Sequence, residues 1–259
     1  MIRVDNATYT WMGDPGPQPV TQVGFEYTST KSIFTMEVDN KVKMEIMFLS
    51  PIRPYDEKAQ SLTSSYLEVT VESLDGLDHD FQLYSDISAG KTFFITCCIL
   101  ANSATEWVSG DRASVAQWEY SHNIWDVDVA YHRVYRQTHL HFSETSDQAD
   151  WGYWYWATQN VLGLTFQSGA DKVVRDAFQS KGKLADTTDT NFWPINEDFP
   201  VFGSIVSPMR TLFALNLMQE QAIRFEGQNG NITLNSLWTS YFPDETTAVS
   251  RECPVGRQC

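Results

Sequence analysis

Short runs in which apolar and polar residues alternate with a period of two constrain the fold of this chain more than any other feature. Residues 23–27 alternate in this way, and two further β-rich runs, 33–38 and 42–48, flank the pair Asp39-Asn40. Alternation of this kind predicts strands with one buried face. An Asp-Asn pair between two such runs predicts a β-hairpin.

A second pair of alternating runs, 66–71 and 81–87, is separated by the turn residues Asp75-Gly76. Further strands are predicted at residues 116–120, 131–137, 138–142, 153–158 and 163–168. Many short strands with turn signals between them indicate an all-β protein built as a sandwich or barrel. An aromatic content of 14% favours the same class, because aromatic side chains are enriched in strands.

Only two segments carry helical signals. Residues 171–181 place apolar side chains at helical spacing and are followed by Gly182, a residue type that commonly ends helices. Residues 236–250 show a weaker helical pattern, which Pro243 interrupts. The expected fold is therefore an all-β sandwich with one or two short helices.

Charge and hydrophobicity exclude two classes of partner. The chain has 33 acidic and 18 basic residues, and its formal net charge of −15 repels a nucleic-acid backbone. No stretch reaches the ~18 apolar residues of a membrane-spanning helix. Residues 1–15 lack the apolar core of a signal peptide. We therefore expect no nucleic-acid partner and no membrane segment.

The four cysteines do not indicate a metal site or a disulfide framework. Cys97 and Cys98 are adjacent, and adjacent cysteines rarely bridge each other because the geometry is strained. Cys253 and Cys259 complete the set, and the spacing of the four matches no zinc pattern. Free thiols are the expected state.

The one close histidine pair, His139 and His141, would point to the same face of the predicted strand 138–142, as two metal ligands would. Glu144 is near in sequence, but no third ligand is evident. Two histidines on the solvent face of a strand are the commoner arrangement. We therefore predict no metal site and no cofactor.

Several carboxylates are candidates for a glycosidase-like acid and base. They are Glu106, Asp111, Glu119, Asp147 and Asp150. Such chemistry needs two carboxyl groups roughly 5–10 Å apart with separated pKa values, and sequence spacing establishes neither condition. Solvated surface charge is the expectation for these residues, and the catalytic residues stay unknown. No Ser-His-Asp spacing, nucleophile elbow, P-loop or dinucleotide fingerprint stands out.

The densest aromatic run is Trp151-Gly152-Tyr153-Trp154-Tyr155-Trp156. On a strand the two tyrosines face one side and Trp154 and Trp156 face the other. One face is expected to pack in the sandwich core. The other is a candidate platform for stacking on sugars or a candidate interface with another domain, since bare apolar surface is unusual on a soluble monomer.

Two short motifs matter if the protein is secreted. Asn6-Ala7-Thr8 and Asn231-Ile232-Thr233 are N-glycosylation sequons, so Asn6 and Asn231 are candidate glycan acceptors. Motifs this short also occur by chance.

Longer blocks of sequence carry a family resemblance. These blocks are TYTWMGDP (8–15), FEYTSTKSIFTMEV (25–38), FLSPI (48–52), QLYSDISA (82–89), EWVSGDR (106–112), DQADWGYWYWAT (147–158), FQSGAD (166–171) and SLWTSYF (236–242). Together they resemble the fungal glutaminase A family, over most of residues 1–242. The resemblance implies a secreted protein whose whole form hydrolyses glutamine to glutamate and ammonia.

The resemblance also implies that this region and the catalytic site lie in different domains. The matching region, 1–242, is similar to the N-terminal β-sandwich of the family, which is supersandwich-like. In the family this region precedes a large helical domain of the α/α toroid type, which is expected to carry the active site. We therefore expect this chain to be a fragment that lacks its C-terminal helical catalytic partner, and we carry no catalytic residue across.

The sequence departs from the family pattern in two segments. Residues 90–105 (GKTFFITCCILANSAT) interrupt a stretch that is continuous in the family, and we interpret them as a translated, unspliced intron, with a genuine loop or strand insertion as the alternative. Codons for Gly90-Lys91 and Ala101-Asn102 can carry a 5′ splice site and a branch point. Residues 243–259 are interpreted as a truncated, aberrant tail.

Three functions remain open from the sequence. The chain is a non-catalytic part of a secreted glutaminase, a free-standing carbohydrate-binding β-sandwich, or an accessory domain of a glycoside hydrolase. The last rests on architecture alone, which is weak evidence for function.

Overall fold

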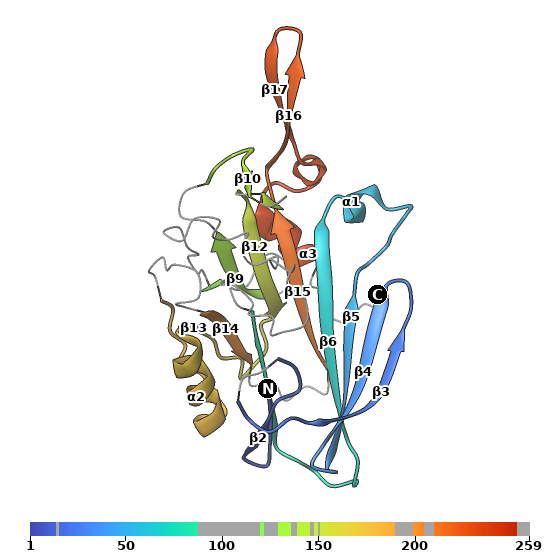
Figure 1. Cartoon of the computed structure of the whole chain (residues 1–259), viewed down its shortest axis with the longest axis vertical. Coiled ribbons are helices and arrows are strands. Elements are labelled where there is room, and N and C mark those ends of the chain that lie inside the picture. Colours follow the sequence, from blue (N-terminus) through green and yellow to red (C-terminus); the bar gives the residue numbers. More distant parts are fainter. Residues whose placement is uncertain are drawn as a thin grey trace.

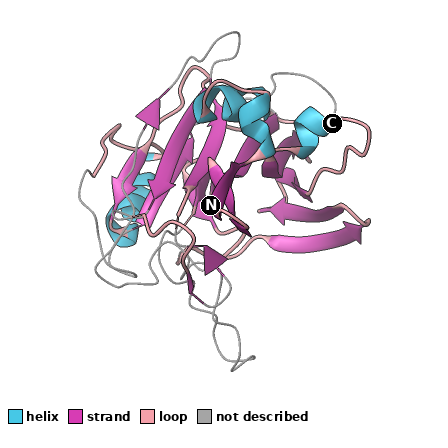
Figure 2. Cartoon of the chain, turned by 90° about the horizontal axis from the view of Figure 1, so that it is seen from above, coloured by secondary structure: helices cyan, strands magenta, loops and turns pink. Residues whose placement is uncertain are grey.

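The computed structural model describes residues 1–13, 16–87, 120–121, 129–135, 139–145, 148–149, 151–189, 199–204 and 210–252. Strands form most of this part of the chain, and the helical segments lie at the periphery of the sheets (Figures 1 and 2). The prediction of an all-β sandwich with a few short helices is confirmed. None of the helices in the described ranges is long and apolar enough to cross a membrane.

The larger sheet contains eight antiparallel strands over the described residues. In spatial order they are β3 (Thr21–Tyr27), β4 (Lys31–Val38), β5 (Val42–Leu49), β6 (Thr63–Ser73), β15 (Arg210–Met218), β12 (Tyr153–Gln159), β9 (Val129–Tyr135) and β8 (Tyr120–Ser121). The smaller sheet contains five, in the order β13 (Gln167–Gly169), β14 (Phe199–Ser204), β7 (Phe81–Asp86), β1 (Ile2–Val4) and β2 (Ala7–Tyr9).

The remaining elements are short. Two small hairpins are β10 (Glu144–Thr145) with β11 (Gln148–Ala149), and β16 (Gln221–Gly227) with β17 (Gly230–Asn235). The helices are α1 (Glu57–Gln60), α2 (Asp171–Lys181), the 3₁₀ turn η2 (Leu237–Ser240) and α3 (Glu245–Glu252).

The main core lies between the two sheets. Ile2, Val4 and Leu83 from the smaller sheet share a buried cluster with residues of the larger sheet such as Met44 and Phe213. Each of these side chains is almost fully buried. Apolar residues alternate along strands such as β5 and β6, so one face of the larger sheet reaches this interior, as in other face-to-face sandwiches.

The edge strand β3 differs from the expectation. Residues 23–27 do form a strand, but the alternating residues Val23, Phe25 and Tyr27 are 50% to 76% exposed, so the expected buried face was wrong.

A second core covers the opposite face of the larger sheet. Tyr155 and Met218 pack there beneath Trp238, Phe242 and Val249, which come from the η2–α3 region. The helix α2 builds a third cluster at the smaller sheet, where Phe178 packs on Tyr84 with 4.9 Å between ring centroids. Both faces of the larger sheet are therefore covered over part of their area.

The turn and helix signals read from the sequence are confirmed. Asp39 and Asn40 have positive φ angles of 51° and 55° and connect β4 to β5, whose residues Val38 and Val42 pair. Gly182 ends α2 in the left-handed conformation, with φ 67°. The helical segment that begins after Ser236 divides into η2 and α3 around Pro243.

Some strand predictions were wrong. Residues 139–142 form a turn rather than a strand, with Phe142 at φ 61° and the Ser143 N–H donating to the Leu140 carbonyl over 3.0 Å. The predicted strand 163–168 begins only at Gln167. The runs 66–71 and 81–87 do form β6 and β7, but these strands belong to different sheets, so the Asp75-Gly76 turn carries the chain between sheets.

The hydrophobic periodicity of the sequence did not predict the central strand β15, which pairs with β6 and β12. Its sequence RTLFALNLM is nearly continuous in apolar residues because both faces of the strand are covered. A short run of that kind is not distinguishable from a buried helix by periodicity.

Candidate functional site

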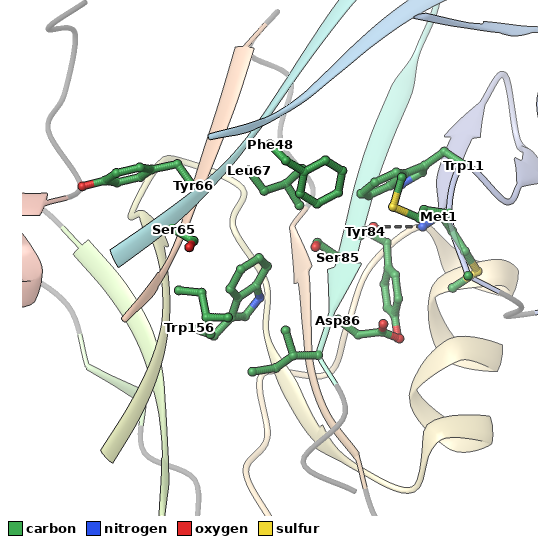
Figure 3. A pocket seen from close by; sticks show the side chains of 14 residues that line it. Met1, Trp11, Phe48, Ser65, Tyr66, Leu67, Tyr84, Ser85, Asp86 and Trp156 are labelled. Carbon is green, nitrogen blue, oxygen red and sulfur yellow. Dashed lines mark hydrogen bonds between the residues drawn. The ribbon is translucent and has the colours of Figure 1, made fainter. Parts of the chain in front are cut away.

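The candidate site considered first is a cavity of about 340 Å³ between the two sheets. Phe48, Leu67 and Trp156 reach it from the larger sheet, and Tyr84 and Asp86 reach it from β7 (Figure 3). Its wall is mainly apolar and aromatic, and the Trp156 ring stacks on Phe213 at 5.2 Å with an interplanar angle of 4°. The cavity suits an apolar or aromatic group.

Two charged side chains at one end of this cavity, Asp86 and Arg175, are paired with each other. Asp86 accepts hydrogen bonds from the Tyr84 hydroxyl over 3.1 Å and from Arg175 Nε over 3.0 Å. Arg175 also contacts Asp171 at 3.3 Å. Burial raises the pKa of Tyr84 well above its ordinary value, so its hydroxyl stays protonated and serves as a donor. The cluster fastens α2 to β7.

A second polar cluster lies on the other face of the larger sheet. The Tyr155 hydroxyl donates to Glu245 Oε2 over 2.6 Å, and burial raises the pKa of Glu245. Burial likewise raises the pKa of Tyr155, so this hydroxyl also remains a donor. Because Glu245 lies in the first turn of α3, the bond ties that helix to β12.

The aromatic run predicted as a platform is divided between the two faces of β12. Its five aromatic residues are Trp151, Tyr153, Trp154, Tyr155 and Trp156. Trp156 is 5% exposed and belongs to the sandwich interior, whereas Tyr155 is fully buried beneath the α3 region. Trp151, Tyr153 and Trp154 are partly buried, and the Trp151 indole donates to the Gln221 carbonyl over 2.8 Å. Tyr155 and Trp156 therefore pack in the interior and are not part of an accessible surface.

The predicted histidine pair is close in space although it is not on a strand. The rings of His139 and His141 lie 5.8 Å apart between centroids, and His139 also contacts Tyr153 at 4.9 Å. Over the described part of the chain, no three histidine, cysteine, aspartate or glutamate side chains gather as metal ligands. The pair belongs to an aromatic cluster.

Other predicted residues fall elsewhere. Asn6 and Asn231 are exposed, in the β1–β2 turn and on β17. Outside the described residues lie segment 90–105, all four cysteines, and the carboxylates Glu106, Asp111, Glu119, Asp147 and Asp150.

Sequence reasoning missed both polar clusters. Asp86 and Arg175 are separated by 89 residues, and Tyr155 and Glu245 by 90. No local spacing signals a pair of that separation. The one available signal was the cost of burying a carboxylate next to apolar residues, which requires a distant donor.

Comparison of the sequence with known proteins places this chain in a family. The model of a domain of unknown function, DUF5127, matches residues 30–253. The chain belongs to the DUF5127 family. Glutaminase A of Aspergillus oryzae (strain ATCC 42149 / RIB 40) is 49% identical over 256 residues, which cover 96% of this chain and 34% of that relative.

A relative from Arthroderma benhamiae (strain ATCC MYA-4681 / CBS 112371), also named as a glutaminase, is 26% identical over 90% of the chain and 28% of its own length. The resemblance to the glutaminase A family is therefore confirmed. This chain spans about a third of the length of these curated relatives.

Proposed function

We propose that the chain is a non-catalytic β-sandwich region of a secreted glutaminase, which hydrolyses glutamine to glutamate and ammonia. The observation that carries this proposal is the alignment with glutaminase A at 49% identity over 96% of the chain. Since the chain spans 34% of that relative, most of the relative lies outside the match. We place the catalytic groups in that remaining part, in a helical domain.

The geometry of the described residues supports a scaffolding role. Asp86 is engaged by Tyr84 and Arg175, and Glu245 is engaged by Tyr155. A general base or nucleophile must instead be within hydrogen-bond reach of a substrate. Both clusters connect a helix to a sheet, which is how a rigid support for a neighbouring domain is built.

Ammonia release from glutamine tests the proposal. We expect the purified 259-residue chain to release no ammonia above the buffer rate. A chimera in which this chain replaces the matched third of Aspergillus oryzae glutaminase A should release ammonia. Turnover by the isolated chain would overturn the non-catalytic assignment, and an inactive but folded chimera would count against the glutaminase assignment.

A glycan array separates this proposal from the binding-module alternative. We expect no glycan binding by the isolated chain, because Trp156 is buried in the sandwich and Tyr155 beneath α3. Binding that is lost on Trp154→Ala would favour the carbohydrate-binding function instead.

A further inference from the structure

The hairpin β16–β17 projects from the body of the molecule, at the top of Figure 1. Over the described residues, these two strands pair only with each other and form a sheet separate from the two large ones. An isolated two-stranded hairpin is at best marginally stable in water, and packing on another element normally supports it.

One face of this hairpin is apolar. The register places Ile223 opposite Leu234 and Phe225 opposite Ile232. Directly opposed residues share a face, and alternate residues along a strand do so too, so these four side chains lie together. They are 48% to 57% exposed. We call these four residues the hairpin apolar face.

The opposite face is polar. It places Arg224 opposite Thr233 and Glu226 opposite Asn231. The Arg224 guanidinium lies 5.3 Å from the centre of the Phe142 ring, so the base of this polar face contacts the body of the molecule. A glycan on Asn231 would extend from the polar side and leave the hairpin apolar face clear.

We propose that the hairpin apolar face docks on the part of a longer glutaminase A-type polypeptide that this chain does not contain. The inference rests on the proposed function, because it takes its partner from the same polypeptide. Of the Aspergillus relative, 34% of the length matches this chain, so about two thirds of a whole protein is available to cover the face. The docking region would present a complementary apolar surface.

The size of the face favours a tethered partner over a second copy of this chain. Four half-exposed side chains of this size offer on the order of 400 Å², whereas a standard interface buries roughly 800 Å² on each partner. Two free copies would therefore bury too little area to associate stably. A covalently linked domain binds at a millimolar effective concentration, for which a small patch suffices.

Photo-crosslinking in the chimera described above tests the docking directly. We would introduce Phe225→p-benzoylphenylalanine on the apolar face and, as the matched control, Arg224→p-benzoylphenylalanine on the polar face. We expect position 225 to crosslink to peptides outside this chain at least ten-fold more than position 224. Equal or absent crosslinking would overturn the proposal, and crosslinks between two copies of the isolated chain would assign the face to self-association instead.

Thermal denaturation gives an independent readout. The double substitution Phe225→Ser with Ile232→Ser should lower the Tm of the chimera by more than it lowers the Tm of the isolated chain. The control pair Arg224→Ser with Thr233→Ser should change both proteins equally. Equal shifts for the apolar pair in both proteins would contradict docking.

Docking and activity can fail separately. An active chimera without crosslinks at position 225 refutes the docking and retains the glutaminase assignment. An inactive chimera that crosslinks from position 225 retains the docking and counts against the activity.

Discussion

His79 joins two turns that belong to different parts of the sandwich. Its Nδ1 lies 2.9 Å from Asp5 Oδ2, and its Nε2 lies 2.9 Å from Asp75 Oδ1. Asp5 follows β1, and Asp75 lies in the connection from β6 to β7. Both ring nitrogens must carry a proton to donate to two carboxylates, so the charged imidazolium fits this position.

This arrangement makes stability depend on pH in a defined direction. Hydrogen bonds to Asp75 and then to Asp5 raise the pKa of His79, so its contribution is present below the unfolded pKa of about 6.5 and is lost as pH rises through the folded value. The pKa of Asp5 is lowered by its bond to His79, and the pKa of Asp75 by the Leu77 N–H and then His79. Their contributions are lost as pH falls below about 4.

We therefore expect the cluster to stabilise the fold most between about pH 4 and 6.5. The buried Met1 amino group, whose pKa burial lowers to about 5, adds stability as pH rises over the same range, so the His79 effect is measured as a difference between variant and parent. From pH 5.5 to pH 9 the urea midpoint of the parent should fall relative to that of His79→Gln. His141→Gln, which alters an exposed histidine outside the cluster, is the control and should behave as the parent. The same change with pH in His79→Gln as in the parent would show that the cluster is not responsible.

At the scale of elements, the end of α2 depends on Gly182. This residue has φ 67°, and its N–H donates to the Phe178 carbonyl over 2.7 Å. A Cβ atom there would lie 2.8 Å from Arg3 Nη1 and 2.9 Å from Gln82 Oε1, two atoms that contact each other at 3.2 Å. A side chain would therefore disturb both the helix cap and a contact on the smaller sheet.

We expect Gly182→Ala to lower the free energy of unfolding by more than the roughly 1–2 kcal/mol cost of left-handed backbone alone. Gly76→Ala is the matched control, because Gly76 has φ 77° but open space around its Cβ position. Urea denaturation of both variants separates the steric cost from the backbone cost. An equal loss of unfolding free energy in the two variants would show that the Arg3 and Gln82 side chains accommodate the new methyl group at no cost.

At the scale of the whole molecule, the insertion predicted from the sequence at residues 90–105 should affect how much of the chain folds in soluble form. The segment contains five large apolar residues, Phe93, Phe94, Ile95, Ile99 and Leu100. An insertion of this length adds little loop-closure entropy. An apolar segment of this kind instead promotes aggregation of the folding chain.

We expect deletion of residues 90–105 to increase the soluble yield. A second variant keeps the length of the segment and replaces its five large apolar residues by serine. If apolarity is the cause, both variants should be more soluble than the parent in the same expression trial. A deletion variant that is neither more soluble nor more heat-stable than the parent would refute the expectation.

Local sequence determined much of this fold. The alternation in 33–38 and 42–48 and the Asp39-Asn40 turn are sufficient for the β4–β5 hairpin, because neighbouring residues supply both the period and the positive φ angles. Gly182 and Pro243 set helix boundaries for the same reason, since each acts on its own backbone. The resemblance of several sequence blocks to the glutaminase A family was also evident from the sequence alone.

Tertiary structure alone decided the rest. The position of β15 between β6 and β12, and the partners of Asp86 and Glu245, depend on residues far apart in the chain. The alternation of Tyr155 and Trp156 showed that they face opposite sides, but not that both sides are covered. Period and turn chemistry are local properties, whereas sheet order and burial minimise the exposed area of the whole chain, and only the folded molecule fixes them.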